Sequence, residues 1–93
     1  MSRSRIFVNR ILKGRALASL EIEAAMTGKR PFVVGIVRAG SGREPVFRTT
    51  TAHEAEEYAT EKMKAEPTVH GAVISFERAP DGPSVLVSRV LPF

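Results

Sequence analysis

Residues 50–78, TTAHEAEEYATEKMKAEPTVHGAVISFER, predict a capped helix followed by a buried strand. Thr51 and Glu54 have the S/T-x-x-E spacing of a capping box, in which the hydroxyl accepts a hydrogen bond from the amide three residues later. Pro67 ends the helix, because the residue before a proline disfavours the α region. The apolar run at residues 69–76 then has the length of a strand. This unit predicts a mixed α+β fold.

The predicted helix at residues 52–65 has two unlike faces. One face is apolar at helical spacing and is expected to pack on a sheet; it consists of Ala52, Ala55, Ala59 and Met63. The opposite face carries Glu54, Glu57, Glu61 and Lys64. Because charge runs on helices are usually exposed, we interpret these glutamates as a solvated face and not as the paired carboxylates of an acid–base catalyst.

A second helix is expected at residues 9–27, with Asn9 as its cap and Gly28 as its stop. The segment is rich in alanine and leucine, which favour helix. Apolar residues also alternate at positions 16–22, so a strand is the alternative there. Residues 6–8 are either a short strand or the entry to this helix.

Two apolar faces run along the helix expected at residues 9–27. One is formed by Leu12, Ala16, Leu17, Leu20 and Ala24. The other, nearly opposite, is formed by Ile11, Ala18, Ile22 and Ala25. A surface helix of a small domain needs only one apolar face, so the second face needs a cover. We predict that a second copy of the chain covers it in a homodimer; burial within the same domain is the alternative.

Further strands complete a single small domain. Apolar or β-branched runs predict strands at residues 31–39, 46–50 and 84–91, and turn residues separate them. The predicted fold class is α+β, in the order α-β-β-α-β-β, with a four-stranded, mainly antiparallel sheet and two helices. We assign residues 9–93 to this domain and residues 1–8 to a basic N-terminal end.

Positive charge is concentrated at the start of the chain. The net charge is +4 over 93 residues, and residues 1–30 carry seven Lys or Arg against two Glu. Such a segment favours an acidic partner, which is a nucleic acid, an acidic protein surface or an anionic membrane. The candidate contact residues are Arg3, Arg5, Arg10, Lys13, Arg15, Lys29 and Arg30. A basic segment that is merely solvated is the alternative.

No pattern for catalysis, metal binding or cofactor binding is present in the sequence. The chain has no cysteine, and its two histidines, His53 and His70, lack the spacing of metal ligands. The glycine turn at residues 40–43 falls short of a phosphate-binding loop, which needs a longer glycine pattern before a helix. No apolar run approaches the ~20 residues that cross a bilayer. We therefore expect a protein without enzymatic activity, metal, cofactor or membrane span.

One resemblance rests on residues 51–59, TAHEAEEYA, and residues 70–74, HGAVI. The segment at residues 32–76 that contains them resembles small phage-encoded accessory proteins, including anti-CRISPR inhibitors, which often join a hairpin to an alanine-rich helix and a further strand. The resemblance implies an inhibitor that binds a host macromolecular machine in the cytoplasm of a bacterial or phage-infected cell. It covers about half of the chain and assigns no functional residue.

The sequence therefore predicts a non-enzymatic interaction protein that binds an acidic macromolecular partner and self-associates. The alternative is a small basic nucleic-acid-binding protein that contacts backbone phosphates. The chain has only five Phe and one Tyr, few for a surface on which bases stack.

Overall fold

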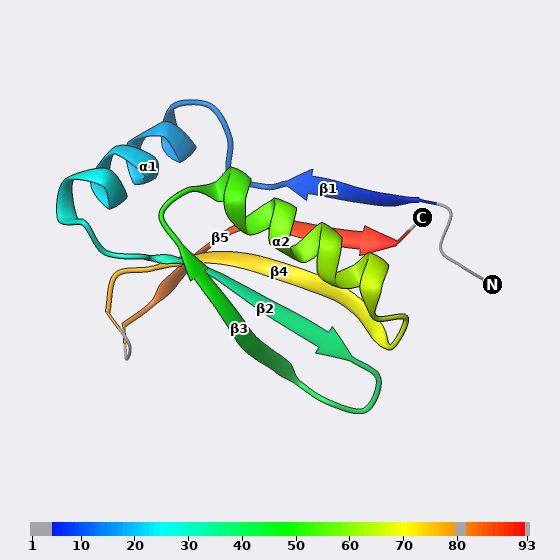
Figure 1. Ribbon diagram of the computed structural model, residues 1–93. Helices are drawn as coiled ribbons and strands as arrows, with labels where there is room; N and C mark the ends of the chain where they lie inside the picture. Colours follow the sequence, from blue (N-terminus) through cyan, green and yellow to red (C-terminus); the bar gives the residue numbers. More distant parts are fainter. Residues whose placement is uncertain (1–4, 80–81, 93) are drawn as a thin grey trace.

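A five-stranded antiparallel sheet and two helices form the protein in the computed structural model, which describes residues 5–79 and 82–92 (Figure 1). Along the chain the elements are β1 (Ile6–Arg10), α1 (Arg15–Thr27), β2 (Phe32–Arg38), β3 (Arg43–Thr49), α2 (Ala52–Ala65), β4 (Val69–Glu77) and β5 (Ser84–Pro92). The strands lie in the order β1-β5-β4-β2-β3, and each neighbouring pair is antiparallel. The α+β class is confirmed. Within the described ranges, neither helix has the length and apolar character that crossing a bilayer requires.

The predicted bounds of α2 are confirmed, and its start has one half of a capping box. The amide of Glu54 donates to Thr51 Oγ1 at 3.1 Å. The Glu54 carboxylate accepts from the hydroxyls of Thr51 and Thr49, both at 3.1 Å, where a complete box would have it accept from the cap amide. The helix ends at Ala65, two residues before Pro67, in agreement with the restriction that proline places on its neighbour.

The alanine face of α2 packs on one face of the sheet. Its buried residues include Ala52, Ala55, Ala59 and Met63. Because alanine has a minimal side chain, α2 approaches the strands closely, and large strand residues fill the remaining space. Phe32 of β2 and Phe76 of β4 meet there edge to face, with ring centroids 5.1 Å apart. The hydrophobic core thus lies between the sheet and α2.

Strand β1 shows that the prediction for residues 9–27 was wrong in its first part. β1 pairs with β5, so the sheet has five strands instead of four and the chain order begins with a strand. Asn9 lies in β1 and caps no helix; α1 begins at Arg15, after Gly14 at φ 66°. Glycine adopts that conformation at little cost, so the chain turns there from strand to helix. Residues 6–8 form part of this strand and not of a basic end outside the domain.

Helix α1 lies beyond one end of the sheet and contributes a single face to the core (Figure 1). Its buried residues are Leu17, Leu20 and Ala24, while Ala16, which we expected on the same face, is exposed. The predicted stop is confirmed. Gly28 has φ 69°, and its amide donates to the Ala24 carbonyl at 3.1 Å, which is a common helix ending.

The two outer strands of the sheet, β1 and β3, differ in regularity. β1 pairs with β5 without interruption over its five residues. In β3, by contrast, Phe47 pairs with Val34 and Pro45 pairs with Gly35, which leaves Val46 as an extra residue. Such a bulge bends and twists a strand. The outer edge of β3 is therefore irregular near its middle.

A partly buried ion pair joins β1 to α2. The Arg10 guanidinium donates to both carboxylate oxygens of Glu56, through Nε at 2.9 Å and Nη2 at 2.7 Å. The Glu56 side chain is only 8% exposed. This hydrogen bonding raises the pKa of Arg10 above its ordinary value. Bidentate arginine–carboxylate contacts are strong and directional, so the pair fixes the outermost strand to the helix.

We expect Arg10→Ala to lower the free energy of unfolding by about 1–3 kcal/mol, because the buried Glu56 carboxylate loses its charged donor. The double variant Arg10→Met with Glu56→Met should recover much of that loss, since no unpaired charge remains. Urea denaturation followed by circular dichroism measures both. Arg48→Ala is the matched control: it breaks an ion pair whose side chains are 50% and 22% exposed, and it should cost less than about 1 kcal/mol. Equal losses for the two single variants would contradict this role of Arg10.

Candidate functional site

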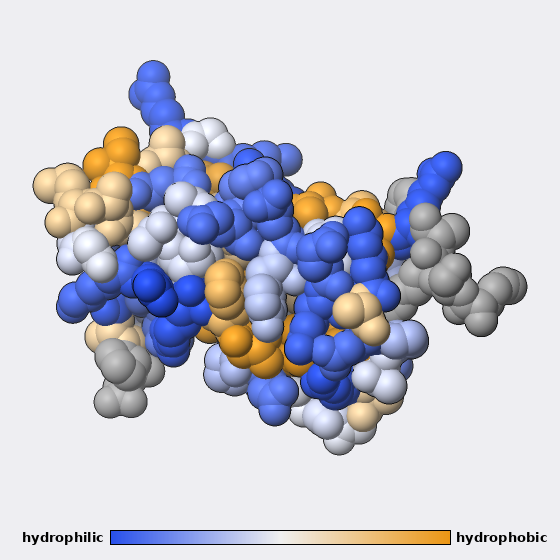
Figure 2. Space-filling model, viewed as in Figure 1, coloured by the Kyte–Doolittle hydropathy of each residue, from blue (hydrophilic) through white to orange (hydrophobic). Residues whose placement is uncertain are grey.

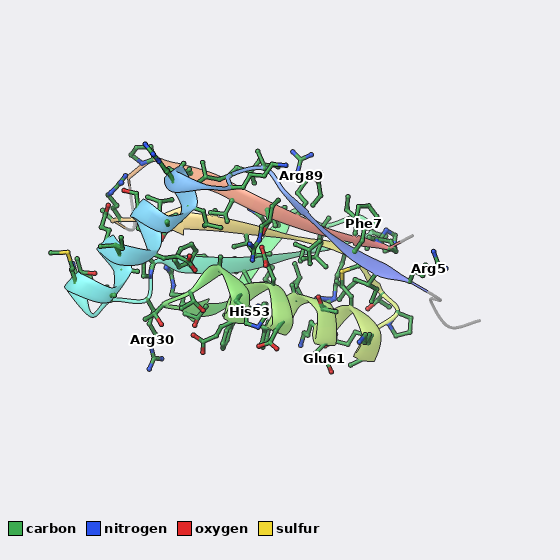
Figure 3. All side chains as sticks on the ribbon, turned by 90° about the horizontal axis from the view of Figure 1, so that it is seen from above. Arg5, Phe7, Arg30, His53, Glu61 and Arg89 are labelled. Carbon is green, nitrogen blue, oxygen red and sulfur yellow. The ribbon has the colours of Figure 1, made fainter. Side chains whose placement is uncertain are left out.

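The sheet face turned away from α2 carries no helix in the described part of the chain. Both helices bury their apolar residues in one core on the other side, and Figure 3 shows Phe7 and Arg89 pointing away from α2. Strand register arranges this face in rows across the sheet. We define the open face as four rows: Phe7, Leu91, Gly71, Val37 and Arg43; Asn9, Arg89, Val73, Gly35 and Pro45; Leu86, Ser75, Val33 and Arg48; Ser84 and Glu77.

The positive charge of the described residues is not balanced evenly over the surface. Every glutamate contacts another described residue through an ion pair or a hydrogen bond. Within residues 5–79 and 82–92, the cations that have no acidic partner are Lys13, Arg15, Lys29, Arg30, Arg43 and Arg89. The two arginines of this set that lie within strands both belong to the open face. Its one acid, Glu77, accepts from Arg48 at 3.1 Å.

A glycine lets Arg43 lie flat across the sheet. A Cβ atom on Gly35 would stand 2.5 Å from Arg43 Cγ, closer than non-bonded carbons approach. Gly35 therefore leaves space for the aliphatic stem of Arg43, which crosses from β3 over β2. Arg89 lies in the same cross-strand row as Gly35, with Val73 between them. Neighbouring strands are about 4.8 Å apart, and β4 and β2 lie between β5 and β3, so Arg89 and Arg43 leave the sheet roughly 15 Å apart, and the stem of Arg43 shortens the distance between their charged ends.

The basic residues predicted from the sequence do not form one patch. Arg3 lies outside the described residues, Arg5 directly precedes β1, and Arg10 is engaged by Glu56. Lys13 and Arg15 lie at the start of α1, whereas Lys29 and Arg30 follow its end. That helix has 13 residues, so the two pairs are about 20 Å apart along it. Reasoning from the sequence missed Arg43 and Arg89, although Arg89 interrupts an apolar strand, which is a usable signal for a solvent-facing position.

The second apolar face predicted for the first helix is exposed. Ala18, Ile22 and Ala25 lie on the outer surface of α1, and Ile22 is 61% exposed. Met26, which we did not predict, adjoins them and is 81% exposed, while Ile11 is exposed in the bend after β1. Figure 2 shows hydrophobic residues at the surface over α1 and hydrophilic ones over α2. The alternative of burial within the domain is wrong, and we call Ala18, Ile22, Ala25 and Met26 the outer ridge of α1.

The acidic surface of α2 offers little for chemistry. A hollow of about 730 Å³ borders this helix and is lined by glutamates that are mostly exposed, together with His53 and Tyr58. His53 lies 3.5 Å from Glu57 at the surface, and His70 is exposed on β4. Across the ranges that the structure describes, no three His, Asp or Glu residues gather closely enough to hold a metal ion. The hollow is a solvated surface groove, as the charge pattern of α2 predicts.

Comparison with known proteins gave no significant match. No family model, no curated protein and no solved structure matched the chain. The assignment of function therefore rests on the surfaces described above.

Two carboxylates that form ion pairs near the surface give the stability of the fold a dependence on pH. A hydrogen bond from Arg78 holds the pKa of Glu23 below its ordinary value of 4.5, and hydrogen bonds from Lys62 and Arg38 do the same for Glu66. A carboxyl whose pKa is lower in the folded state stabilises the fold above its unfolded pKa. That contribution is lost as the pH falls through the folded pKa.

We expect Glu23→Gln to reduce the acid-induced loss of stability between about pH 5 and pH 3. The free energy of unfolding, measured by urea titration at several pH values, should fall less steeply in this variant than in the wild type. Glu57→Gln is the control, because the Glu57 carboxylate contacts only an exposed histidine and receives no hydrogen bond from arginine. A steeper acid dependence in Glu23→Gln would contradict the assigned role of Arg78.

Proposed function

We propose that the protein is a non-enzymatic binding protein whose partner is a nucleic acid and whose contact surface is the open face. The observation that carries this proposal is the placement of Arg43 and Arg89 in adjacent rows of a helix-free sheet face, without acidic partners among the described residues. Arginine binds phosphate oxygens with two parallel hydrogen bonds. A polar, positively charged and solvated surface is typical of proteins that contact a nucleic-acid backbone.

The distribution of charge supports an oriented approach of a polyanion. Helix α2 carries exposed glutamates such as Glu57 and Glu61. Figure 3 shows Glu61 and the helix itself on the side of the sheet opposite Arg89. A negative surface on one side and unpaired cations on the other give the molecule an asymmetric field. Such a field steers a polyanion toward the positive side during encounter. The open face would therefore meet the phosphates first.

The composition of the open face favours a nucleic acid over an acidic protein. Protein interfaces have an apolar centre rich in large side chains. Among the described residues, the large hydrophobic side chains that are well exposed, Val8, Ile11, Ile22 and Met26, all lie outside the open face, whose own apolar side chains, such as Leu86 and Leu91, are half-buried. An acidic protein partner, which the sequence alone favours, is the alternative. The role of a phage-encoded inhibitor stays a prediction that the resemblance alone supports.

We expect Arg43→Gln with Arg89→Gln to weaken the salt dependence of binding to a single-stranded oligonucleotide. Each phosphate contact to a single strand contributes about 0.7 to the slope of log K against log salt, so two lost contacts should reduce the slope by about 1.4. Fluorescence anisotropy with a labelled oligonucleotide at several salt concentrations measures the slope. The wild type should bind most tightly at low salt.

The matched control is Lys29→Gln with Arg30→Gln, which changes the net charge equally at the far end of α1. Its slope should change less than that of the Arg43 and Arg89 variant. A larger change in the control would place the contact in the N-terminal third of the chain instead. Failure of the wild type to bind any oligonucleotide at low salt would contradict the nucleic-acid proposal and favour the acidic protein partner.

We also propose that two copies associate through the outer ridge of α1. The exposure of Ile22 and Met26 on one helical surface supports this, because contiguous apolar side chains in water favour association.

Ile22→Glu is expected to shift the protein from dimer to monomer in sedimentation velocity at high micromolar concentration, because it places a charge in the proposed interface. Its thermal stability as a monomer should be close to that of the wild type, since the side chain is largely exposed. Ala25→Ser, a small change on the same surface, is the control and should still dimerise. A wild type that is monomeric throughout this concentration range rules out the interface.

A further inference from the structure

A small hollow lies in the open face beside the stem of Arg43. Its volume is about 200 Å³, and its walls include Val33, Pro45, Arg43, Ser75, Ser84 and Glu77. Pockets for drug-sized ligands are commonly ~300–1,000 Å³, so this hollow admits a single planar ring system or a group of similar size. Both apolar and polar atoms line it, which is the composition of a pocket that orients its ligand.

The polar groups of the hollow are left with free hydrogen-bonding capacity. Oε1 of Glu77 accepts from Arg48 Nη2 at 3.1 Å, while Oε2 has no partner among the described residues. Ser75 is 7% exposed, and its hydroxyl makes no hydrogen bond to another described residue. An ionised carboxylate only accepts hydrogen bonds. The hollow therefore presents an acceptor and a hydroxyl to whatever enters it.

The Glu77 carboxylate makes the hollow unfavourable for a phosphate and favourable for a nucleobase. A phosphate in the hollow would face the Glu77 carboxylate at close range, and like charges repel. A nucleobase is neutral and flat, and its edge carries N–H donors. Arginine guanidinium planes stack on unpaired bases, and Arg43 lies at the rim with its stem held over Gly35.

We propose that the hollow receives one unpaired base of a single-stranded nucleic acid and that Glu77 accepts a hydrogen bond from the exocyclic amino group of that base. This inference rests on the proposed function, since Arg43 and Arg89 hold the backbone outside the hollow. Adenine, cytosine and guanine offer such an amino group, whereas thymine has a carbonyl oxygen in its place. The pocket thus prefers a strand that contains a base with an exocyclic amino group, such as cytosine, over a strand of thymine alone.

The test compares two labelled strands of about ten nucleotides, a length within the range that small binding domains occupy. One strand is all thymine, and the other has a single central cytosine. The wild type should bind the cytosine strand about tenfold more tightly at the same salt concentration. Glu77→Gln should bring the ratio of the two dissociation constants close to one, because an amide donates to thymine as readily as it accepts from cytosine.

The ratio is the chosen readout because Glu77→Gln also releases Arg48, which should tighten binding to both strands. Glu57→Gln on α2 changes the net charge equally and should keep the wild-type ratio. Ser84→Leu, a substitution at an exposed position, fills the hollow and should abolish the preference while the salt dependence remains. Equal affinity of the wild type for both strands overturns the base pocket and leaves the proposed function standing. If the wild type binds neither strand, both the base pocket and the proposed function are contradicted.

Discussion

The contact between the alanine face of α2 and the sheet is the constraint on which the rest of the structure depends. Helix α2 lies against every strand, and the absence of bulk at its alanines brings it close enough to bury the strand residues beneath it. The large apolar residues therefore gather on one side. The other side retains half-buried aliphatic residues such as Val73, Leu86 and Leu91. Stems of arginine can cover such residues while their charged ends stay in water, so a one-sided core leads to a basic open face.

Local signals made α2 and β4 predictable from the sequence, whereas β1 depends on distant partners. The cap at Thr51, the alanine spacing and Pro67 all lie within the segment that they control. Residues 6–10 contain no comparable signal, and they become a strand because β5 offers a free edge and Glu56 offers a carboxylate to Arg10. The helix expected at residues 9–27 begins six residues too early, because Gly14, with φ 66°, forms the turn that precedes the helix.

The excess of positive charge could be predicted from the sequence, but the residues that form the candidate site could not. Counting charges along the chain pointed correctly to excess positive charge, but pairing decides which cations remain available. Arg10 is neutralised by a residue 46 positions away, and no local pattern reveals such a contact. Arg43 and Arg89 come from strands far apart in the sequence, and only the sheet register brings them to adjacent rows. The exposed ridge of α1 was predictable because helical periodicity is a local property.

The bulge in β3 has a consequence for how the molecule behaves at high concentration. A sheet can grow by adding a strand from a neighbouring chain wherever an edge presents a regular row of amides and carbonyls. Pro45 has no amide hydrogen, and the extra residue beside it breaks the spacing that an incoming strand would need to match. The outer edge of β3 is thus a poor template for pairing with a strand of a neighbouring chain. The protein can expose a broad, helix-free sheet face to a partner without offering that edge to copies of itself.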